Sequence, residues 1–120
     1  MNQNSPADVL AALDAVLRER RGADPQSSYV AGLYAAGLNR ILEKIGEEAT
    51  EVVLAAKDNA DGSAPAALVG EVADLWFHSL VLLAQQDLSS DDVQACLAER
   101  FGLSGLEEKA ARSRRTGQPT

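Results

Sequence analysis

Five acidic side chains have the types and spacing best suited to chemistry, and they fall into two short groups. The first group is Glu47, Glu48 and Glu51, and the second is Glu71 and Asp74. Within each group the carboxylates recur at three- or four-residue spacing, which places them on one face of a helix. Carboxylates gathered in this way bind divalent cations or act as general acids and bases.

The first group lies in Leu38–Asp58, which the spacing of its apolar residues predicts to be a helix. The arc opposite the apolar face carries Arg40 and Lys44 together with the three glutamates. Like charges one turn apart on an exposed helix repel by about 0.2–0.5 kcal/mol per pair. Taken alone, this pattern also fits a solvated acidic face in which Lys44 pairs with Glu48.

The second group lies in a strongly apolar segment that begins at Pro65. Between Pro65 and Gln85 the only ionised side chains are Glu71 and Asp74, with His78 one turn further along. A helix that is apolar on nearly all sides is expected to be buried. Because an uncompensated buried charge costs several kcal/mol, these two carboxylates must meet a cation or be protonated.

The short turn at Asp61–Pro65 predicts that the two helices run antiparallel, so that both groups face one small volume. Such a cluster of carboxylates requires a divalent ion, and oxygen ligands favour Mg²⁺ or Mn²⁺ over Zn²⁺. A di-iron site is disfavoured because it needs Glu-x-x-His pairs, whereas Leu75 stands three positions before His78, the only histidine.

Composition excludes several other classes of protein. The chain has 120 residues, 46% of them hydrophobic, which suits one compact domain. Its formal net charge of −7 opposes binding to nucleic acid or to an anionic membrane. Its longest purely apolar runs have five residues, so we expect no membrane helix and no secretory signal. With Cys96 as the only cysteine, we expect a cytoplasmic protein without an intramolecular disulfide or a cysteine-rich zinc site.

The remaining segments also show helical spacing, so the sequence predicts an all-α antiparallel bundle of four to five helices, completed by dimerisation. The expected elements are a helix opened by Ser5 and Pro6, a loop over Gly22–Ser28, a short helix from Tyr29, a helix from near Leu38, a turn with Ser63 as N-cap, a helix to about Gln86, a helix over Val93–Phe101 capped by Ser89, and a short helix over Leu106–Arg112. We expect residues 1–112 to form one domain and residues 113–120 to be a loose polar tail.

Three strings carry a resemblance to a known family: LNRILEKIGEEATEVVLAAKD, EVADLWFHSLVLLAQQDLSSDDV and SGLEEKAAR. Together they resemble phosphoribosyl-ATP pyrophosphohydrolases, which are all-α nucleoside-triphosphate pyrophosphatases with the signature E-E-x-x-E followed by E-x-x-D. The resemblance spans roughly Ser28–Arg112 and implies a homo-oligomer, usually a dimer. It also implies Mg²⁺-dependent cleavage of phosphoribosyl-ATP to phosphoribosyl-AMP and pyrophosphate, the second step of histidine biosynthesis, with Mn²⁺ as a possible substitute.

The resemblance also assigns roles to individual residues. The implied metal ligands are Glu48, Glu51, Glu71 and Asp74. The implied catalytic residues are Glu47 and Glu48, where Glu47 is either an outer ligand of the metal or the base that orients water. The candidates for binding the nucleotide substrate are Lys44, Lys57, Lys109 and Arg112, of which the last two would reach the substrate of a partner subunit.

Several alternatives remain open from the sequence. A house-cleaning nucleoside-triphosphate pyrophosphatase would share the same metal ligands, and a helical dimerisation module would carry the acidic seam by accident. Tyr29 could stack on a base or ribose, or pack in the core. His78 could hydrogen-bond to Asp74, or be a satisfied core residue.

Overall fold

The computed structural model describes residues 6–103, with side chains from residue 9 onward. All regular structure in this range is helical, which confirms the all-α class. The helices are α1 (Pro6–Glu19), α2 (Tyr29–Ala36), α3 (Leu38–Asp58), α4 (Pro65–Gln85) and α5 (Ser90–Arg100). The chain divides into two units, Met1–Ser89 and Ser90–Thr120, which are described separately. The domain boundary expected after residue 112 lies outside the described residues.

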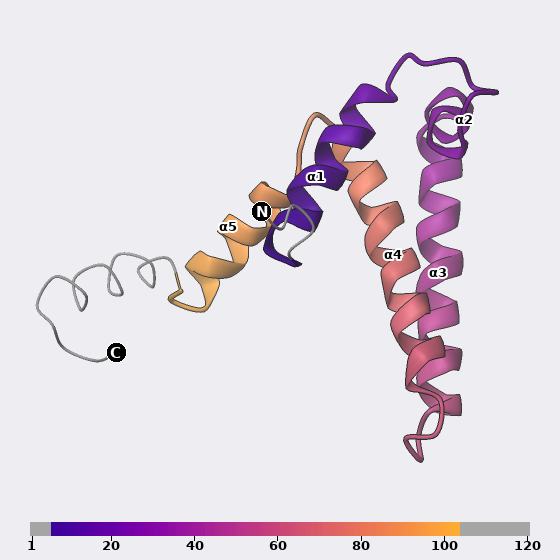
Figure 1. Cartoon of the computed structure of the whole chain (residues 1–120), viewed down its shortest axis with the longest axis vertical. Helices are drawn as coiled ribbons and strands as arrows, with labels where there is room; N and C mark the ends of the chain where they lie inside the picture. Colours follow the sequence, from indigo (N-terminus) through magenta and orange to yellow (C-terminus); the bar gives the residue numbers. More distant parts are fainter. Residues whose placement is uncertain (1–5, 104–120) are drawn as a thin grey trace, which may run out of the picture. The chain divides into compact units, whose positions relative to one another are not determined.

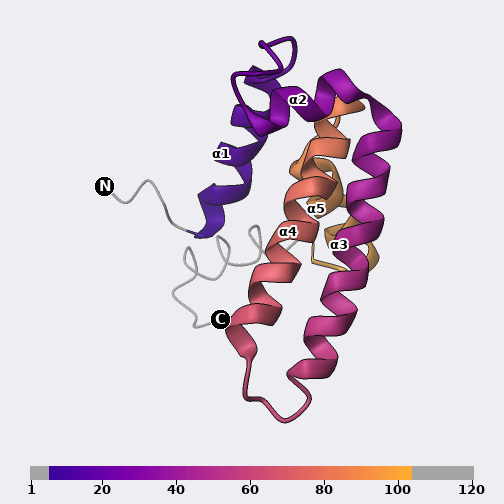
Figure 2. The same ribbon diagram turned by 90° about the vertical axis from the view of Figure 1, so that its right-hand side faces the viewer.

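Helices α3 and α4 form an antiparallel hairpin, as the sequence predicts (Figures 1 and 2). In the connecting turn the Asn59 side chain accepts a hydrogen bond from the Ala64 backbone N–H at 2.7 Å, and Asp61 accepts one from Ser63 at 3.0 Å. The prediction that Ser63 caps α4 is wrong. The N-cap is Ala64, without a side-chain cap, because the turn already uses the backbone of Ser63 in its bond to Asp61.

A short helix precedes the hairpin, as predicted. The Ser28 hydroxyl caps α2 by accepting a hydrogen bond from the Ala31 N–H at 3.0 Å. The helix ends at Gly37, whose φ of 98° lies where L-residues other than glycine are strained. Since Gly37 also precedes the first residue of α3, it breaks what would otherwise be one continuous apolar helix.

The core of the first unit lies at the end of the hairpin where α1 and α2 pack against it (Figure 2). Its buried side chains come from all four helices: Leu17, Val30, Leu33, Ile41, Leu80, Val81 and Ala84. The Tyr34 hydroxyl donates to the Leu17 carbonyl oxygen at 2.8 Å, and Arg21 pairs with Asp87 just beyond α4. The first contact joins α2 to α1, and the second joins the segment after α1 to the segment after α4.

The other half of the hairpin is open, which corrects the expectation that α4 is buried on all sides. Val69 and Trp76 of α4 are 67% and 58% exposed, and Val53 and Leu54 of α3 are each 59% exposed. The reason is geometric, because the buried residues of α1 and α2 pack against the last turns of α4 and leave its first turns without this contact. In the described part of the first unit, the apolar side chains of this half are therefore largely open to solvent.

One described helix, α4, is long and apolar enough to cross a membrane, with a mean hydropathy of 1.5 over its most apolar window. The core helix of a water-soluble domain meets the same criteria, so one such helix is weak support for a membrane span. Glu71 and Asp74 lie within this helix, where carboxylates facing lipid would be costly.

The described part of the second unit is α5 with the turn that follows it. The helix starts at Ser90, directly after the predicted cap Ser89 and three residues earlier than the predicted start at Val93. Acidic Asp91 and Asp92 occupy its first turn, where they complement the helix dipole. The predicted helix over Leu106–Arg112 and the tail beyond it lie outside the described residues.

Candidate metal centre on the helical hairpin

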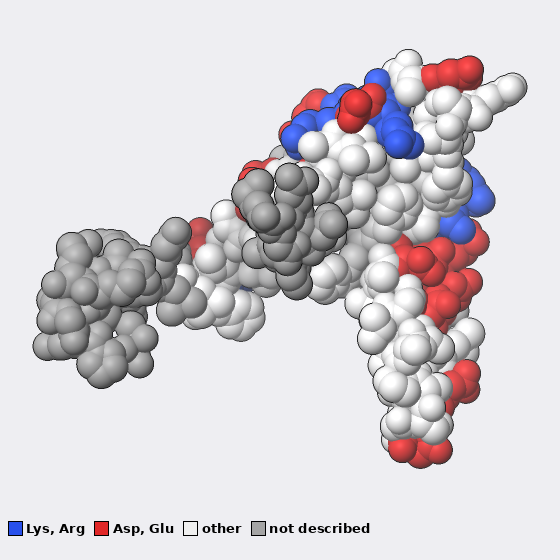
Figure 3. Space-filling model, in the orientation of Figure 1, with Lys and Arg blue, Asp and Glu red and all other residues white. Residues whose placement is uncertain are grey.

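Acidic side chains gather along the open half of the α3–α4 hairpin (Figure 3). Three of them, Glu48 on α3 with Glu71 and Asp74 on α4, each place one carboxylate oxygen within 4.8 Å of the others. We call these three residues the carboxylate cluster. Glu71 and Asp74 are neighbours on α4, and the antiparallel pairing of the two helices brings Glu48, which is 23 positions before Glu71, beside them.

The cluster has two buried oxygen atoms that lack a hydrogen-bond partner. These atoms are Oε2 of Glu48 and Oε2 of Glu71, and Glu48 as a whole is only 6% exposed. Buried carboxylate oxygens normally accept hydrogen bonds, so two such atoms beside a third carboxylate are a costly arrangement for the protein alone. A divalent cation would satisfy both, and an all-oxygen donor set suits Mg²⁺ or Mn²⁺. The residues present therefore fit the implied metal.

Glu51, the fourth predicted ligand, borders the cluster. Its exposed carboxyl group lies beside Glu71, and the hydrogen bond and negative charge of Glu71 raise the pKa of Glu51 above its ordinary value. A hydrogen bond to Glu48 and the charge of Lys44 act in the opposite direction but are weaker. Two acids placed this closely favour holding one proton between them. The role of Glu51 as a metal ligand stays a prediction.

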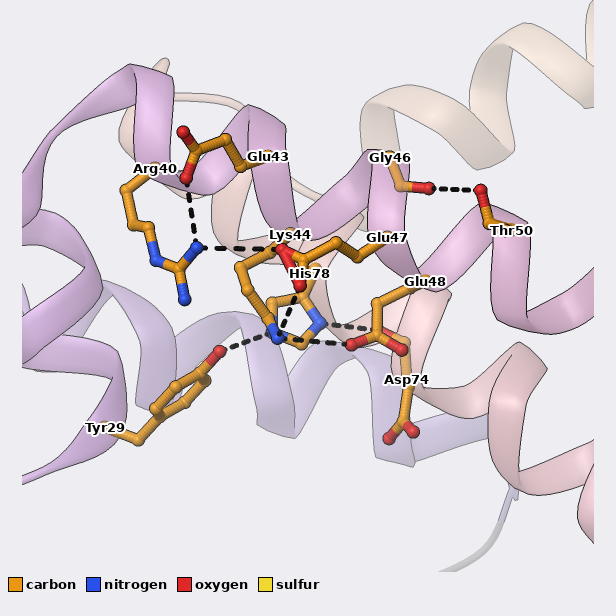
Figure 4. A network of polar contacts seen from close by, with 10 residues as sticks. All are labelled: Tyr29, Arg40, Glu43, Lys44, Gly46, Glu47, Glu48, Thr50, Asp74 and His78. Atoms are coloured by element: carbon orange, nitrogen blue, oxygen red, sulfur yellow. Dashed lines mark hydrogen bonds and ion pairs between the residues drawn. The ribbon is translucent and has the colours of Figure 1, made fainter.

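Among the described residues, Lys44 is the cation that pairs with the cluster (Figure 4). Its Nζ lies 3.5 Å from Oε1 of Glu48 and 3.9 Å from Oε1 of Glu47, and its side chain is 19% exposed. Arg40 lies 3.6 Å from Glu47 and 3.0 Å from Glu43. The pairing of Lys44 with Glu48, expected from the sequence, is therefore present, and it leaves the other oxygen of Glu48 without a partner.

The remaining predicted residues lie at different distances from the cluster. Glu47 is half exposed and is held by Lys44 and Arg40, outside the three-residue cluster. Lys57 lies in the last turn of α3, six residues beyond Glu51 and so about 9 Å further along the helix axis. Lys109 and Arg112 lie outside the described residues. The catalytic role of Glu47 and the substrate-binding roles of the lysines and Arg112 remain predictions.

A hydrogen-bonded pair next to the cluster was not anticipated from the sequence. The buried ring of His78 lies with Nε2 2.8 Å from the Tyr29 hydroxyl and Nδ1 2.8 Å from the backbone carbonyl oxygen of Asp74. The bond to Asp74 therefore involves its main chain and leaves its carboxylate available to the cluster. Tyr29 and His78 are 49 positions apart on separate helices, so no local spacing could have linked them.

Comparisons with known proteins identify the family of this chain. The family model described as phosphoribosyl-ATP pyrophosphohydrolase matches residues 10–101. The phosphoribosyl-ATP pyrophosphatases of Burkholderia mallei (strain SAVP1) and Burkholderia pseudomallei (strain 668) are each 60% identical over 115 residues, covering 96% of this chain and 94% of the relative. These matches confirm the resemblance noted in the sequence, and the chain belongs to the phosphoribosyl-ATP pyrophosphohydrolase family.

Proposed function

We propose that this protein hydrolyses phosphoribosyl-ATP to phosphoribosyl-AMP and pyrophosphate, the second step of histidine biosynthesis, and that it requires Mg²⁺, which Mn²⁺ can replace. The single observation that carries the proposal is the carboxylate cluster, with its two buried oxygens that lack a partner. Family membership supports the choice of substrate, since the relatives at 60% identity bear the name phosphoribosyl-ATP pyrophosphatase.

In this proposal, the cluster and neighbouring Glu51 hold the metal. When bound, the ion polarises the phosphoryl oxygens and offsets the charge that develops on the departing pyrophosphate. The half-exposed carboxylate of Glu47 accepts the proton of the water that attacks the α-phosphorus, while the bond from that phosphorus to the bridging oxygen breaks and pyrophosphate leaves. Lys44 exchanges its contact with Glu48 for a phosphate oxygen, which needs only a small movement of a flexible side chain.

The substrate assignment is tested by measuring pyrophosphate release from phosphoribosyl-ATP and from ordinary nucleoside triphosphates. We expect a higher kcat/KM for phosphoribosyl-ATP, and loss of turnover when EDTA removes the metal or when Asp74 is replaced by Asn. A preference for ordinary triphosphates would contradict the assignment and favour a house-cleaning pyrophosphatase. Wild-type rates in Asp74→Asn would show that the cluster is not the site.

A second copy of the chain is the proposed cover for the open half of the hairpin, and the assembly is most simply a dimer. Its apolar surface includes Val53, Leu54, Val69 and Trp76, which are all more than half exposed in the single chain. Exposed apolar surface of this kind marks an interaction site in most water-soluble proteins, and two paired hairpins would form a four-helix bundle.

Self-association is tested by light scattering on a size-exclusion column and by the fluorescence of Trp76, the only tryptophan. We expect the mass of a dimer or a larger oligomer, and a red shift of the emission on dilution as Trp76 meets water. Replacement of Trp76 by Gln should weaken association, whereas replacement of exposed Val16 on α1 by Gln should not. A monomer at micromolar concentration would contradict this part of the proposal.

The proposed partners and location follow from the charge and the substrate. A net charge of −7 opposes contact with nucleic acid or an anionic membrane, so the partner is a small nucleotide that approaches as a metal complex. We place the reaction in the cytoplasm, where charged nucleotides are made and used. Fractionation that recovers the protein with membranes would contradict this placement.

A further inference from the structure

We infer that Tyr29 is the contact surface for the aromatic base of the nucleotide, and that His78 is the positioning residue that holds its ring. The inference rests on the proposed function for the identity of the nucleotide. It depends on three features of the described residues: the fixed hydroxyl of Tyr29, the exposure of its ring, and its place along the hairpin.

The hydroxyl of Tyr29 is fixed by a buried partner. A backbone carbonyl oxygen can only accept, so Nδ1 of His78 donates to Asp74, and in this tautomer Nε2 accepts from the Tyr29 hydroxyl. His78 is 5% exposed and packs edge-on against Phe77, with ring centroids 5.0 Å apart. Tyr29 is also the first residue of α2, whose N-terminus Ser28 caps. Both its backbone and its hydroxyl are therefore held.

The ring of Tyr29 is nevertheless open to solvent. The residue is 54% exposed, and Phe77 lies on one side of the ring at a centroid distance of 6.4 Å and an angle of 26°. A tyrosine that serves packing usually buries its ring and leaves its hydroxyl in water. Tyr29 does the reverse, which produces a fixed aromatic surface that is available to a ligand. Planar bases stack on such surfaces without any need for hydrogen-bond readout.

The position of Tyr29 matches the order of groups in a nucleotide bound through its phosphates (Figure 4). His78 lies one turn beyond Asp74 on α4, and Lys44 lies one turn before Glu48 on α3. Moving away from the cluster, the hairpin therefore presents carboxylates, then a lysine, and then the tyrosine bound to His78. If the carboxylates and Lys44 hold the phosphate chain, the nucleoside points toward Tyr29.

The test separates the base from the phosphate chain. Calorimetry measures the binding of α,β-methylene-ATP, which resists cleavage between the α- and β-phosphates, and of inorganic tripolyphosphate, which lacks a nucleoside. Both are titrated with Mg²⁺ into the wild type, Tyr29→Leu, Tyr29→Phe and Tyr34→Phe. The last variant is the matched control, because Tyr34 also lies on α2 and also loses one hydroxyl hydrogen bond, to the Leu17 carbonyl oxygen.

We expect Tyr29→Leu to weaken binding of α,β-methylene-ATP about tenfold and to leave tripolyphosphate binding within about twofold of wild type. Tyr29→Phe keeps the ring but lacks the hydroxyl that bonds to His78, so it should weaken binding of α,β-methylene-ATP less, about threefold. Tyr34→Phe should bind both ligands as the wild type does. Equal losses for both ligands in Tyr29→Leu would indicate a structural role and overturn the inference, as would unchanged binding of the nucleotide.

Turnover provides a second readout that separates this inference from the proposed function. With phosphoribosyl-ATP, Tyr29→Leu should raise KM about tenfold with kcat within about threefold of wild type. An unchanged KM in an active enzyme would overturn the role of Tyr29 alone. If the wild type does not cleave phosphoribosyl-ATP, the proposed function fails, and the two binding constants still decide whether Tyr29 contacts a base.

Discussion

Replacement of Glu71 by Gln should stabilise the metal-free protein and abolish its response to Mg²⁺. Glu71 lies within 4.8 Å of both Glu48 and Asp74 in the cluster, and its buried Oε2 has no hydrogen-bond partner. Glutamine has nearly the same shape but no charge, and its amide N–H can donate to the partnerless oxygen of Glu48. The substitution therefore removes repulsion and adds a donor while it removes a ligand for the metal.

The magnitude follows from the separation of the charges. At 4.8 Å, the widest spacing in the cluster, two unit charges repel by about 0.9 kcal/mol in water and by about 3.5 kcal/mol at an effective dielectric constant of about 20. Asp74 is exposed and Lys44 already offsets part of the charge on Glu48, so the lower part of this range applies. We expect a gain of about 1–2 kcal/mol in the free energy of unfolding, or roughly 3–10 °C in Tm.

The assay is urea and thermal unfolding in EDTA and in excess Mg²⁺, at one protein concentration because association also contributes to Tm. In Mg²⁺ the wild type should gain about 1.4 kcal/mol when the ion is at about ten times its Kd, whereas Glu71→Gln should gain little. Glu43→Gln is the matched control, because Glu43 is an exposed acid on α3 that pairs with Arg40 outside the cluster. It should change stability by less than about 0.5 kcal/mol and keep the response to Mg²⁺. A metal-free Glu71→Gln that is less stable than the wild type, or that responds to Mg²⁺ equally, would refute the reasoning.

Three further predictions concern the same hairpin. The raised pKa of Glu51 means that this carboxyl group binds more protons in the folded protein than in the unfolded chain. The free energy of unfolding in EDTA should therefore fall as the pH rises above about 4.5, and Glu51→Gln should flatten this slope in unfolding measured from pH 4 to pH 7. Lys44→Met removes the cation beside a buried glutamate and should cost about 2 kcal/mol in urea unfolding, whereas Arg40→Met, at an exposed pair, should cost less than about 0.5 kcal/mol. Gly37→Ala forces alanine into a left-handed conformation and should lower stability by about 1–2 kcal/mol, whereas Gly46→Ala inside α3 should raise it by about 0.5–1 kcal/mol, both read from Tm.

The order of the helices and the carboxylate cluster were predictable because local rules determine both. Periodic apolar residues define α3 and α4, a short turn forces them antiparallel, and acids three or four positions apart then meet across the seam. The break at Gly37 was also readable from its residue type. The start of α4 could not be predicted in the same way. The side chains of Asp61 and Asn59 compete with that of Ser63 for the backbone N–H groups of the turn, and residue types alone do not say which hydrogen bond forms.

Features that depend on contacts between distant residues could not be predicted from the sequence. The bond between Tyr29 and His78 joins residues 49 positions apart, and its existence depends on how α2 crosses the hairpin. The burial of α4 was overestimated for a related reason. An apolar helix needs a cover, but periodicity does not say whether that cover comes from the same chain, and here α1 and α2 reach only one half of the hairpin.

The carboxylate cluster and the open apolar surface occupy the same half of the hairpin but opposite faces of α4. Val69 and Trp76 lie seven positions apart on one face of α4, whereas Glu71 and Asp74 lie on the opposite face, beside Glu48 of α3. Repulsion among carboxylates and their attraction for a cation both increase as the local dielectric constant falls. An assembly that covered the apolar face alone would therefore leave the dielectric constant around the carboxylates, and with it their repulsion and their affinity for a cation, close to those of the single chain. Self-association and metal binding could then use opposite faces of one helix without either one blocking the other, which is how a strongly apolar helix can also carry two acids.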